Sequence, residues 1–412
     1  MYGASDAAIH AEWALIDTHC DLAWYRPVFY NSIKRLQVRN RFDQQEERVA
    51  KSKISLAMTM MMTSLLASGA RADTFAYSAN ADSNDISVFR IEPTSGKADA
   101  IETVAFPGAE KPGSSTPLTL SPDHLTLFAG VRAQPYTVLS FAIDPKSGRL
   151  SHRGSGPLAD SMANIATDRT GKFLFSASYG GNKVALNPIG SDGIVQAPKD
   201  VIPTGLNAHA FLPSPDNHFV FATNLGSDQI LSFRFDAATG ALTPNDPAAI
   251  KVAEKNGPRH FVFHPNGKFV YLVNELSANL LVFSYDAAHG TWQPIQQATA
   301  LPQGFNGKPW AADIHLTPDG RFLYASERGS STIAAFKVDA ESGKIVPLGS
   351  VPTEKQPRGF AIDPSGHVLA AVGELSDGMS VYTIDQASGA LKLLQSYPVG
   401  KKPNWVEFVS FP

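Results

Sequence analysis

The sequence predicts an all-β fold, a seven-bladed β-propeller, from three observations. A turn built around glycine recurs seven times along the chain, at intervals of 45 to 53 residues. A second kind of turn, with proline in most of its copies, lies between successive glycine turns. Apolar segments of strand length separate the turns, so each repeat supplies four strands, which is the content of one propeller blade.

The composition agrees with many short strands joined by turns. Of the 412 residues, 32 are glycine and 29 are proline, and 24 phenylalanines and 11 tyrosines accompany them. A hydrophobic fraction of 43% is enough for a packed core and excludes a disordered chain. The formal net charge of −3 provides no basic excess for binding nucleic acid. The single cysteine, Cys20, excludes an internal disulfide and a multi-cysteine zinc site.

Residues 51–72 have the three parts of a secretory signal peptide. Lys51 and Lys53 precede a mostly apolar stretch at 54–66, and Ala70-Arg71-Ala72 forms an A-x-A cleavage site. The 13 residues of the stretch are too few to span a bilayer, which takes ~20. We therefore predict cleavage after Ala72, export to the periplasm and a mature protein with no membrane span; without a functional leader the protein would stay in the cytoplasm.

A signal peptide normally begins a chain, so we interpret residues 1–50 as lying upstream of a true start near Val49 or Met58. Within them, Asp17-Thr18-His19-Cys20-Asp21 has metal-binding residue types but no partner motif, and we give it little weight. The mature chain would be residues 73–412, one domain of 340 residues. Residues 1–72 hold nine basic and seven acidic residues, which leaves 26 and 31, a net charge of −5.

The glycine turns define seven repeats. Glycine supplies the positive φ that a tight hairpin needs, so each of these turns should join two antiparallel strands. They are Ser95-Gly96, Ser147-Gly148, Asp192-Gly193, Thr239-Gly240, His289-Gly290, Ser342-Gly343 and Ser388-Gly389.

The second set of turns has only six members. Five of them contain proline, whose fixed φ suits a turn. They are Ser121-Pro122-Asp123, Thr167-Asp168-Arg169, Ser214-Pro215-Asp216, His264-Pro265-Asn266, Thr317-Pro318-Asp319 and Asp363-Pro364-Ser365.

The seventh inner hairpin must come from the two ends of the mature chain. Residues 404–408 resemble an inner strand, and residues 75–78 resemble the strand that follows it. Pairing them would close one blade with both termini and remove exposed sheet edges. The mature length divided by seven is 48.6, which matches the spacing of the turns.

One face of the ring should carry the functional site. The start of each inner strand and the end of its antiparallel neighbour lie at the same mouth of the central channel. Polar and charged residues fall there in successive repeats: Thr116 with Arg132, Asn164 with Tyr179, His209 with Asn224, Arg259 with Glu275, Ala311 and Asp313 with Arg328, and Arg358 with Glu374.

Each of these residues also has a structural interpretation. His209 could be a core histidine bound to a backbone carbonyl. Arg259 and Glu275 could be a structural ion pair across a hairpin, and Arg328 could pair with Glu327 or Asp313. We also expect Trp310 to be a packing residue and His315 to lie toward the core. The functional interpretation depends on their occurring together at one rim.

Several of these segments closely resemble the motifs of the propeller-type 6-phosphogluconolactonase family, over essentially the whole predicted mature chain. The family's fungal relatives include muconate-lactonising cycloisomerases, in which a His, a Glu and two Arg act at the site. By motif, the resemblance implies His209, Glu275, Arg259 and Arg328 as catalytic residues. The matching segments are Gly130-Val131-Arg132, Ser178-Tyr179, residues 256–260 with His264-Pro265, residues 273–276, residues 310–320 and residues 356–360.

Lactone hydrolysis requires a general base, donors for the oxyanion and groups that bind the sugar hydroxyls. His209 or Glu275 can serve as the base, and Arg259 and Arg328 can hold the negative charge. The predicted substrate-binding residues are Arg132, Tyr179, Asn274, Asp313 and Arg358. No set of His, Cys and carboxylate residues has metal-ligand spacing, so we expect neither a metal nor another cofactor.

The predicted export suggests an unphosphorylated substrate, such as glucono- or galactono-1,5-lactone, acted on by a monomer. Two alternatives stay open. A cycloisomerase acting on a carboxymuconate would use the arginines for additional carboxylates, and a non-enzymatic scaffold would use the ring only for binding.

Overall fold

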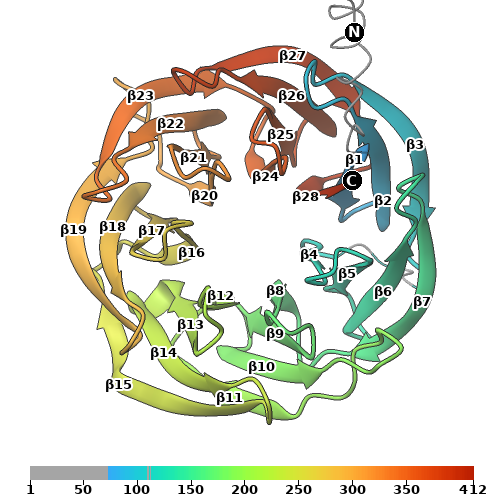
Figure 1. Ribbon diagram of the computed structural model, residues 1–412, viewed down its shortest axis with the longest axis vertical. Helices are drawn as coiled ribbons and strands as arrows, with labels where there is room; N and C mark the ends of the chain where they lie inside the picture. Colours follow the sequence, from blue (N-terminus) through green and yellow to red (C-terminus); the bar gives the residue numbers. More distant parts are fainter. Residues whose placement is uncertain (1–72, 109–110, 112) are drawn as a thin grey trace, which may run out of the picture. The chain divides into compact units, whose positions relative to one another are not determined.

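In the computed structural model of the protein, the residues described are 73–108, 111 and 113–412. The predicted leader and signal segment, residues 1–72, lie outside them. The described residues form 28 strands in seven antiparallel sheets of four strands each, arranged as blades around a central channel (Figure 1). The predicted all-β, seven-bladed propeller is therefore confirmed.

The blades are numbered in chain order, and each is given from its inner to its outer strand. Blade 1 consists of β28 (Pro403–Phe411), β1 (Asp73–Asn80), β2 (Asp85–Ile91) and β3 (Ala98–Ala105). Blade 2 consists of β4 (Leu118–Leu120), β5 (Thr126–Val131), β6 (Thr137–Ile143) and β7 (Leu150–Pro157). Blade 3 consists of β8 (Met162–Thr167), β9 (Phe173–Ser178), β10 (Lys183–Pro188) and β11 (Asp200–Pro203).

The remaining blades follow the same plan. Blade 4 consists of β12 (Ala208–Pro213), β13 (Phe219–Asn224), β14 (Gln229–Asp236) and β15 (Ala241–Lys251), with a short 3-10 helix η1 (Leu225–Ser227) after β13. Blade 5 consists of β16 (Pro258–Phe263), β17 (Phe269–Asn274), β18 (Asn279–Asp286) and β19 (Thr291–Thr299). Blade 6 consists of β20 (Ala311–Leu316), β21 (Phe322–Glu327), β22 (Thr332–Val338) and β23 (Ile345–Pro352). Blade 7 consists of β24 (Pro357–Ile362), β25 (Val368–Gly373), β26 (Gly378–Ile384) and β27 (Leu391–Pro398).

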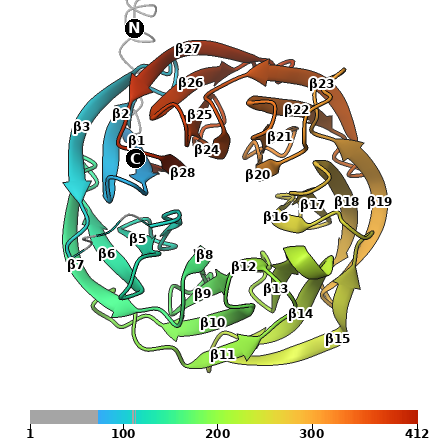
Figure 2. The same ribbon diagram turned by 180° about the vertical axis from the view of Figure 1, so that it is seen from behind.

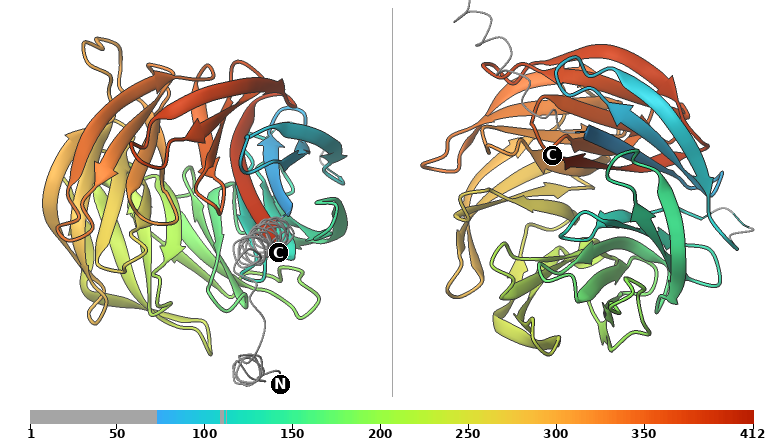
Figure 3. Two further views of the ribbon diagram at one scale, coloured as in Figure 1. Left: turned by 45° about the horizontal axis from the view of Figure 1, so that its top comes forward. Right: turned by 45° about the vertical axis from the view of Figure 1, so that its right-hand side comes forward.

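The two ends of the described chain close blade 1, as the sequence predicts. Strand β28 pairs antiparallel with β1, from Asp73 opposite Phe411 to Asn80 opposite Pro403. Figure 2 shows the last strand inside the first one, seen from the opposite face. The tilted views of Figure 3 show the neighbouring blades packing face to face around the ring. Apolar clusters fill these interfaces; one of them joins Phe322 and Tyr324 of blade 6 to Phe360 and Leu369 of blade 7.

The glycine turns have a second function beyond their backbone conformation. All seven glycines have positive φ, between 65° and 75°. Five of them also lie against a phenylalanine ring of the preceding blade, where a Cβ would overlap the ring. The five pairs are Gly148 with Phe75, Gly240 with Phe173, Gly290 with Phe219, Gly343 with Phe269 and Gly389 with Phe322.

A tyrosine strengthens three of these contacts. The hydroxyl of Tyr271, two residues after Phe269, donates to the carbonyl of Gly343 at 3.0 Å. Tyr77 makes the equivalent bond to the carbonyl of Gly148 at 3.0 Å, and Tyr324 to that of Gly389 at 2.8 Å. Each contact joins an outer turn to the second strand of the blade before it, so the repeat in the sequence reflects packing between blades.

In blade 3 the turn at Asp192-Gly193 is tight, as predicted, because the amide of Gly190 donates to the carbonyl of Ile194 at 2.9 Å. The strands on either side of it are not paired regularly. Strand β10 ends at Pro188 and β11 begins only at Asp200, with one isolated bridge between Ile189 and Val195. Proline has no amide hydrogen to donate, and Pro188 and Pro198 flank the connection, so regular pairing stops there.

Among the described residues there is no helix long and apolar enough to cross a membrane.

We expect Gly343→Ala to lower the free energy of unfolding by about 2–4 kcal/mol, from left-handed backbone strain together with overpacking against Phe269. Gly267→Ala is the matched control, because Gly267 has a φ of 71° but open space around its Cβ position. It should lose only about 1 kcal/mol. Urea unfolding followed by circular dichroism measures both, and equal losses would contradict a packing role for the turn glycine.

Candidate active site

Bulges at the channel mouth place the site residues. In six of the seven blades, the register of the inner strand shifts within its first few residues. His209 falls between Ala208 and Ala210, which pair with Asn224 and Thr223, so it has no partner of its own in the ladder. Arg259 and Arg358 occupy the same place in blades 5 and 7. A bulge turns a side chain away from the regular alternation, and here it gathers these groups at one mouth.

Glu275, which directly follows β17, lies at the centre of the charged cluster. Its Oε2 accepts from Nε of Arg259 at 2.9 Å and from Nη2 of Arg328 at 2.7 Å. Its Oε1 accepts from the indole Nε1 of Trp310 at 3.3 Å. The side chains of the two arginines are only 2% and 4% exposed, and that of Glu275 is 12% exposed. The carboxylate therefore ties blade 5 to blade 6 and has both oxygens occupied.

Backbone carbonyls of blade 6 hold the two guanidinium groups. Arg259 donates through Nη1 to the carbonyl of Ala312. Arg328 donates to the carbonyls of Trp310 and Ala311, at 3.2 and 3.0 Å, and its guanidinium lies 4.0 Å from the Trp310 ring centroid. Among the described residues, Nη2 of Arg259 and Nη1 of Arg328 have no hydrogen-bond partner. One terminal nitrogen of each guanidinium is thus not used by the described protein groups.

The charges of this cluster follow from its burial. Burial lowers the pKa of Arg259 to about 9, with Arg328 adding to the shift, so the group still carries its charge at neutral pH. Burial acts to raise the pKa of Glu275, but Arg328 and Arg259 outweigh it and hold the pKa below its ordinary value. Glu275 is therefore an anion bound by two cations.

His209 lies beside this cluster as a neutral group. Its residue is 4% exposed, and its ring centroid lies 6.0 Å from that of Tyr179 and 5.0 Å from that of His260. Burial, followed by the charge of Arg259 and then His260, holds the pKa of His209 well below its usual value. Its Nδ1 is buried without a hydrogen-bond partner among the described residues. A neutral imidazole near the guanidinium group of Arg259 is suited to accept a proton.

A second pair of guanidinium groups meets at Ser115. Arg132 donates to Oγ of Ser115 at 2.7 Å and to Oγ of Ser161 at 3.0 Å. Arg358 reaches the same Ser115 oxygen at 3.3 Å and Glu374 at 3.4 Å. Burial, together with Arg358, lowers the pKa of Arg132 to about 10, which leaves it charged at neutral pH. Two cations that share a hydroxyl group form a place where an anionic or hydroxyl-rich end of a substrate can bind.

The structure thus brings most of the predicted residues to one mouth but arranges them in two groups. His209, Glu275, Arg259, Arg328 and Tyr179 form the first group. Arg132 and Arg358 form the second.

Asn274 and Asp313 are not presented to a substrate. Asn274 is fully buried, and its amide donates to the carbonyl of Asn279 at 2.9 Å within its own blade. Asp313 is 7% exposed and is bound to His260 and His315. Both fall near strand ends, as predicted, but both are buried and hydrogen-bonded to other groups of the protein.

Sequence reasoning missed three residues of the site. Trp310 is 37% exposed and binds Glu275, although it was expected only to pack. His260 and Ser115 were overlooked, although each directly precedes or follows a residue that was selected. The signal for His260 is the bulge of β16, which turns consecutive residues toward the channel. Ser115 and Trp310 instead lie just before the first residue of an inner strand. His315, expected toward the core, has 38% of its side chain exposed.

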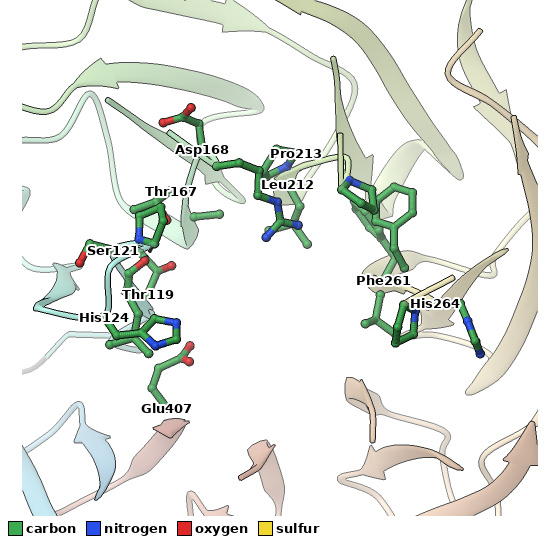
Figure 4. Close-up of a pocket in the computed structure, with 18 residues that line it drawn as sticks. Thr119, Ser121, His124, Thr167, Asp168, Leu212, Pro213, Phe261, His264 and Glu407 are labelled. Atoms are coloured by element: carbon green, nitrogen blue, oxygen red, sulfur yellow. Dashed lines mark hydrogen bonds between the residues drawn. The ribbon is translucent and has the colours of Figure 1, made fainter. Parts of the chain in front are cut away.

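A cavity of about 680 Å³ lies at the other mouth, among the proline turns (Figure 4). Thr119, Thr167, Phe261 and Glu407 line it, whereas Glu275 and its arginines do not. Figure 4 shows these side chains around an open centre. This cavity lacks the paired cations and the neutral histidine, which lie at the first mouth. We therefore place the candidate active site there. Among the described residues, no cluster of three His, Cys, Asp or Glu side chains is arranged to hold a metal ion.

Comparison with known proteins gives the same fold and assigns a family. The model of a family described as lactonase, 7-bladed beta-propeller, matches residues 75–408. The chain belongs to this family. It is therefore a lactonase, a hydrolase of cyclic esters, and the alternative of a non-enzymatic scaffold falls away.

Named relatives agree with this assignment. A 6-phosphogluconolactonase of Serratia proteamaculans is 41% identical over 299 residues, which cover 72% of this chain and 87% of that protein. One of Pectobacterium carotovorum is 39% identical over 298 residues, with the same coverage. The solved structure of a periplasmic gluconolactonase of Pseudomonas aeruginosa is 29% identical with a TM-score of 0.75, covering 83% of this chain and 99% of that one.

We expect Glu275→Gln to lower the free energy of unfolding by about 3 kcal/mol or more, because it leaves two buried guanidinium groups without a counter-charge. Glu102→Gln is the control; Glu102 pairs with Arg149, whose side chain is 57% exposed, and the change should matter by less than about 1 kcal/mol.

The stability of Glu275→Gln should also depend less on pH than that of the wild type. The folded-state pKa of Glu275 is lowered, so its contribution is fully present above the ordinary value of 4.5 and is lost as the pH falls below it. Measured by urea unfolding, the free energy of unfolding should therefore fall less between pH 7 and pH 4 for Glu275→Gln than for the wild type. An equal loss would contradict the ion pair.

Proposed function

We propose that the protein hydrolyses a sugar 1,5-lactone to the aldonic acid without a metal, with His209 as general base. The observation that carries this proposal is the neutral, buried imidazole of His209 near Arg259, one of two guanidinium groups fixed on the carboxylate of Glu275. Such a group accepts a proton at neutral pH, and the cations stabilise the negative charge that forms nearby.

The reaction needs only one proton to be moved and returned. His209 takes a proton from water as the water oxygen attacks the lactone carbonyl, and the carbonyl oxygen becomes an oxyanion. Nη2 of Arg259 and Nη1 of Arg328 are the free donors for this oxyanion. When the tetrahedral intermediate collapses, the bond to the ring oxygen breaks, and the proton on His209 passes to that oxygen. The imidazole is then neutral again.

Glu275 fits the role of an anchor better than that of the base. Both of its oxygens accept hydrogen bonds, and its pKa is lowered by the two arginines that it binds. A carboxylate in this state is a weak base and has no free oxygen to approach water. Its function is to fix the two guanidinium groups in position.

We propose that the substrate is an unphosphorylated glucono- or galactono-lactone and that the protein is exported. The signal-like segment at 51–72 supports export. The similarity to a periplasmic gluconolactonase supports the same combination of compartment and substrate.

A second candidate is the phosphorylated lactone. Arg132 and Arg358 meet at Ser115, and within the described part of the chain Glu374 is the one carboxylate paired with them; such a pair of cations fits a phosphate. The relatives near 40% identity are named 6-phosphogluconolactonases. In the unphosphorylated case, the same pair would bind sugar hydroxyls.

We expect His209→Gln to lower kcat for gluconolactone by roughly 10²- to 10⁴-fold, the usual contribution of a general base. Circular dichroism should show an unchanged fold. Activity of the wild type should survive excess chelator, since no metal is needed. Full activity of the variant would contradict the assignment of the base, and complete loss in chelator would contradict a metal-free reaction.

A substrate panel on the chain expressed from residue 73 decides between the two candidates. The proposal expects kcat/KM for the free lactone to equal or exceed that for the phosphorylated one, and N-terminal sequencing of the exported protein should begin at Asp73. Arg132→Gln tests the second pair of cations. If the phosphorylated lactone is strongly preferred and only that preference is lost in Arg132→Gln, the second candidate is correct.

A further inference from the structure

Three titratable residues form a hydrogen-bonded chain that reaches His209 through His260: the buried His260 and Asp313 and the partly exposed His315. Nδ1 of His260 is 2.8 Å from Oδ1 of Asp313, and Oδ2 of Asp313 is 3.1 Å from Nε2 of His315. Asp313 also accepts from the backbone amides of Ile314 at 3.0 Å and Phe360 at 3.4 Å. The lactonase reaction proposed above uses none of these groups directly.

The hydrogen bonds fix which nitrogen of His260 carries the proton. Burial acts to raise the pKa of Asp313, but the neighbouring His315 and His260 hold it well below its ordinary value, so Asp313 is ionised and can only accept. Burial and the charge of Arg259 lower the pKa of His260 to about 4, so its ring is neutral. Nδ1 of His260 must then carry the single ring proton, and Nε2 carries the lone pair.

The lone pair of His260 and the ring of His209 are complementary. Nε2 of His260 and Nδ1 of His209 are both buried without a partner among the described residues. The two ring centroids are 5.0 Å apart, at an interplanar angle of 64°. The two nitrogens do not hydrogen-bond each other directly, so a proton on Nδ1 of His209 would pair them as donor and acceptor through one bridging water molecule.

We propose that His260 and Asp313 are positioning residues that hold His209 in its Nδ1–H tautomer, so that the lone pair on Nε2 serves as the base. This inference rests on the proposed role of His209. In this chain Asp313 accepts a hydrogen bond from His260, and His260 accepts one from His209 through the bridging water molecule.

The proton balance of the reaction is unchanged by this arrangement. When Nε2 of His209 takes the proton from water, the ring becomes an imidazolium close to the cation of Arg259. The bond from its Nδ1–H toward His260, and from His260 to the carboxylate of Asp313, stabilises that charge until Nε2 returns the proton to the ring oxygen. No proton is lost through the chain.

The test combines three variants with a spectrum of the wild type. His260→Phe keeps the ring shape and removes the acceptor, so kcat should fall on the order of 10- to 100-fold with little change in KM, as for other supporting hydrogen-bond partners. His260→Gln retains an acceptor and should keep more activity. His264→Phe is the matched control, because His264 is a buried histidine of the same blade bound to the carbonyl of Gly320, and its kcat should stay unchanged.

Nitrogen-15 spectra of the imidazole groups report the tautomer directly. The wild type should show the His209 proton on Nδ1, and His260→Phe should move it to Nε2. A wild-type proton on Nε2 overturns the inference, even if every variant fails to fold. So does an unchanged kcat in His260→Phe while His209→Gln is inactive. Full activity of His209→Gln would instead overturn the proposed function.

Discussion

The pairing of β28 with β1 is the constraint on which the rest of the structure depends. The site takes its residues from the inner strands of several blades, and these strands keep their positions only while the ring is closed. The closing strand also contributes contacts of its own. Oδ1 of Asn404 accepts from the amide of Thr116 at 2.8 Å, and Trp405 lies 5.7 Å from the ring of His260 across the channel. The closing strand therefore contacts residues at two places in the ring: Thr116 just before blade 2, and His260 in blade 5.

Much of this fold could be predicted from the sequence because one packing contact is repeated. An outer turn glycine lies on a phenylalanine of the preceding blade, and this recurs in five interfaces. Since the contact needs both a positive φ and the absence of a side chain, only glycine satisfies it, and the repeat remains visible. The two exceptions are blade 1, where Gly96 lies against Leu394 of blade 7, and blade 3, where Gly193 meets Arg153.

The site was only partly predictable, since its contacts run between blades. Strand ends correctly indicate one mouth of the channel, and Arg259 opposite Glu275 lies within a single hairpin. The bond from Arg328 to Glu275, however, joins residues 53 apart, and so does that from His260 to Asp313. One repeat separates both pairs, so equivalent positions in adjacent blades meet. A sequence shows which positions are equivalent but not which direction a bulge gives each side chain, and for this reason Asp313 was assigned to the substrate rather than to His260.

The balance of charge at the mouth explains why an anchored carboxylate is useful to a lactonase. The substrate is neutral at its reacting carbonyl, the transition state carries an oxyanion, and the product is a carboxylate. Two bare guanidinium groups would stabilise the transition state, but they would bind the product at least as well and delay its release. Arg259, Arg328 and Glu275 together carry one net positive charge. Each arginine also keeps one terminal nitrogen without a partner among the described residues. In the proposed reaction that positive charge stabilises the oxyanion, while the overall attraction for the anionic product is reduced.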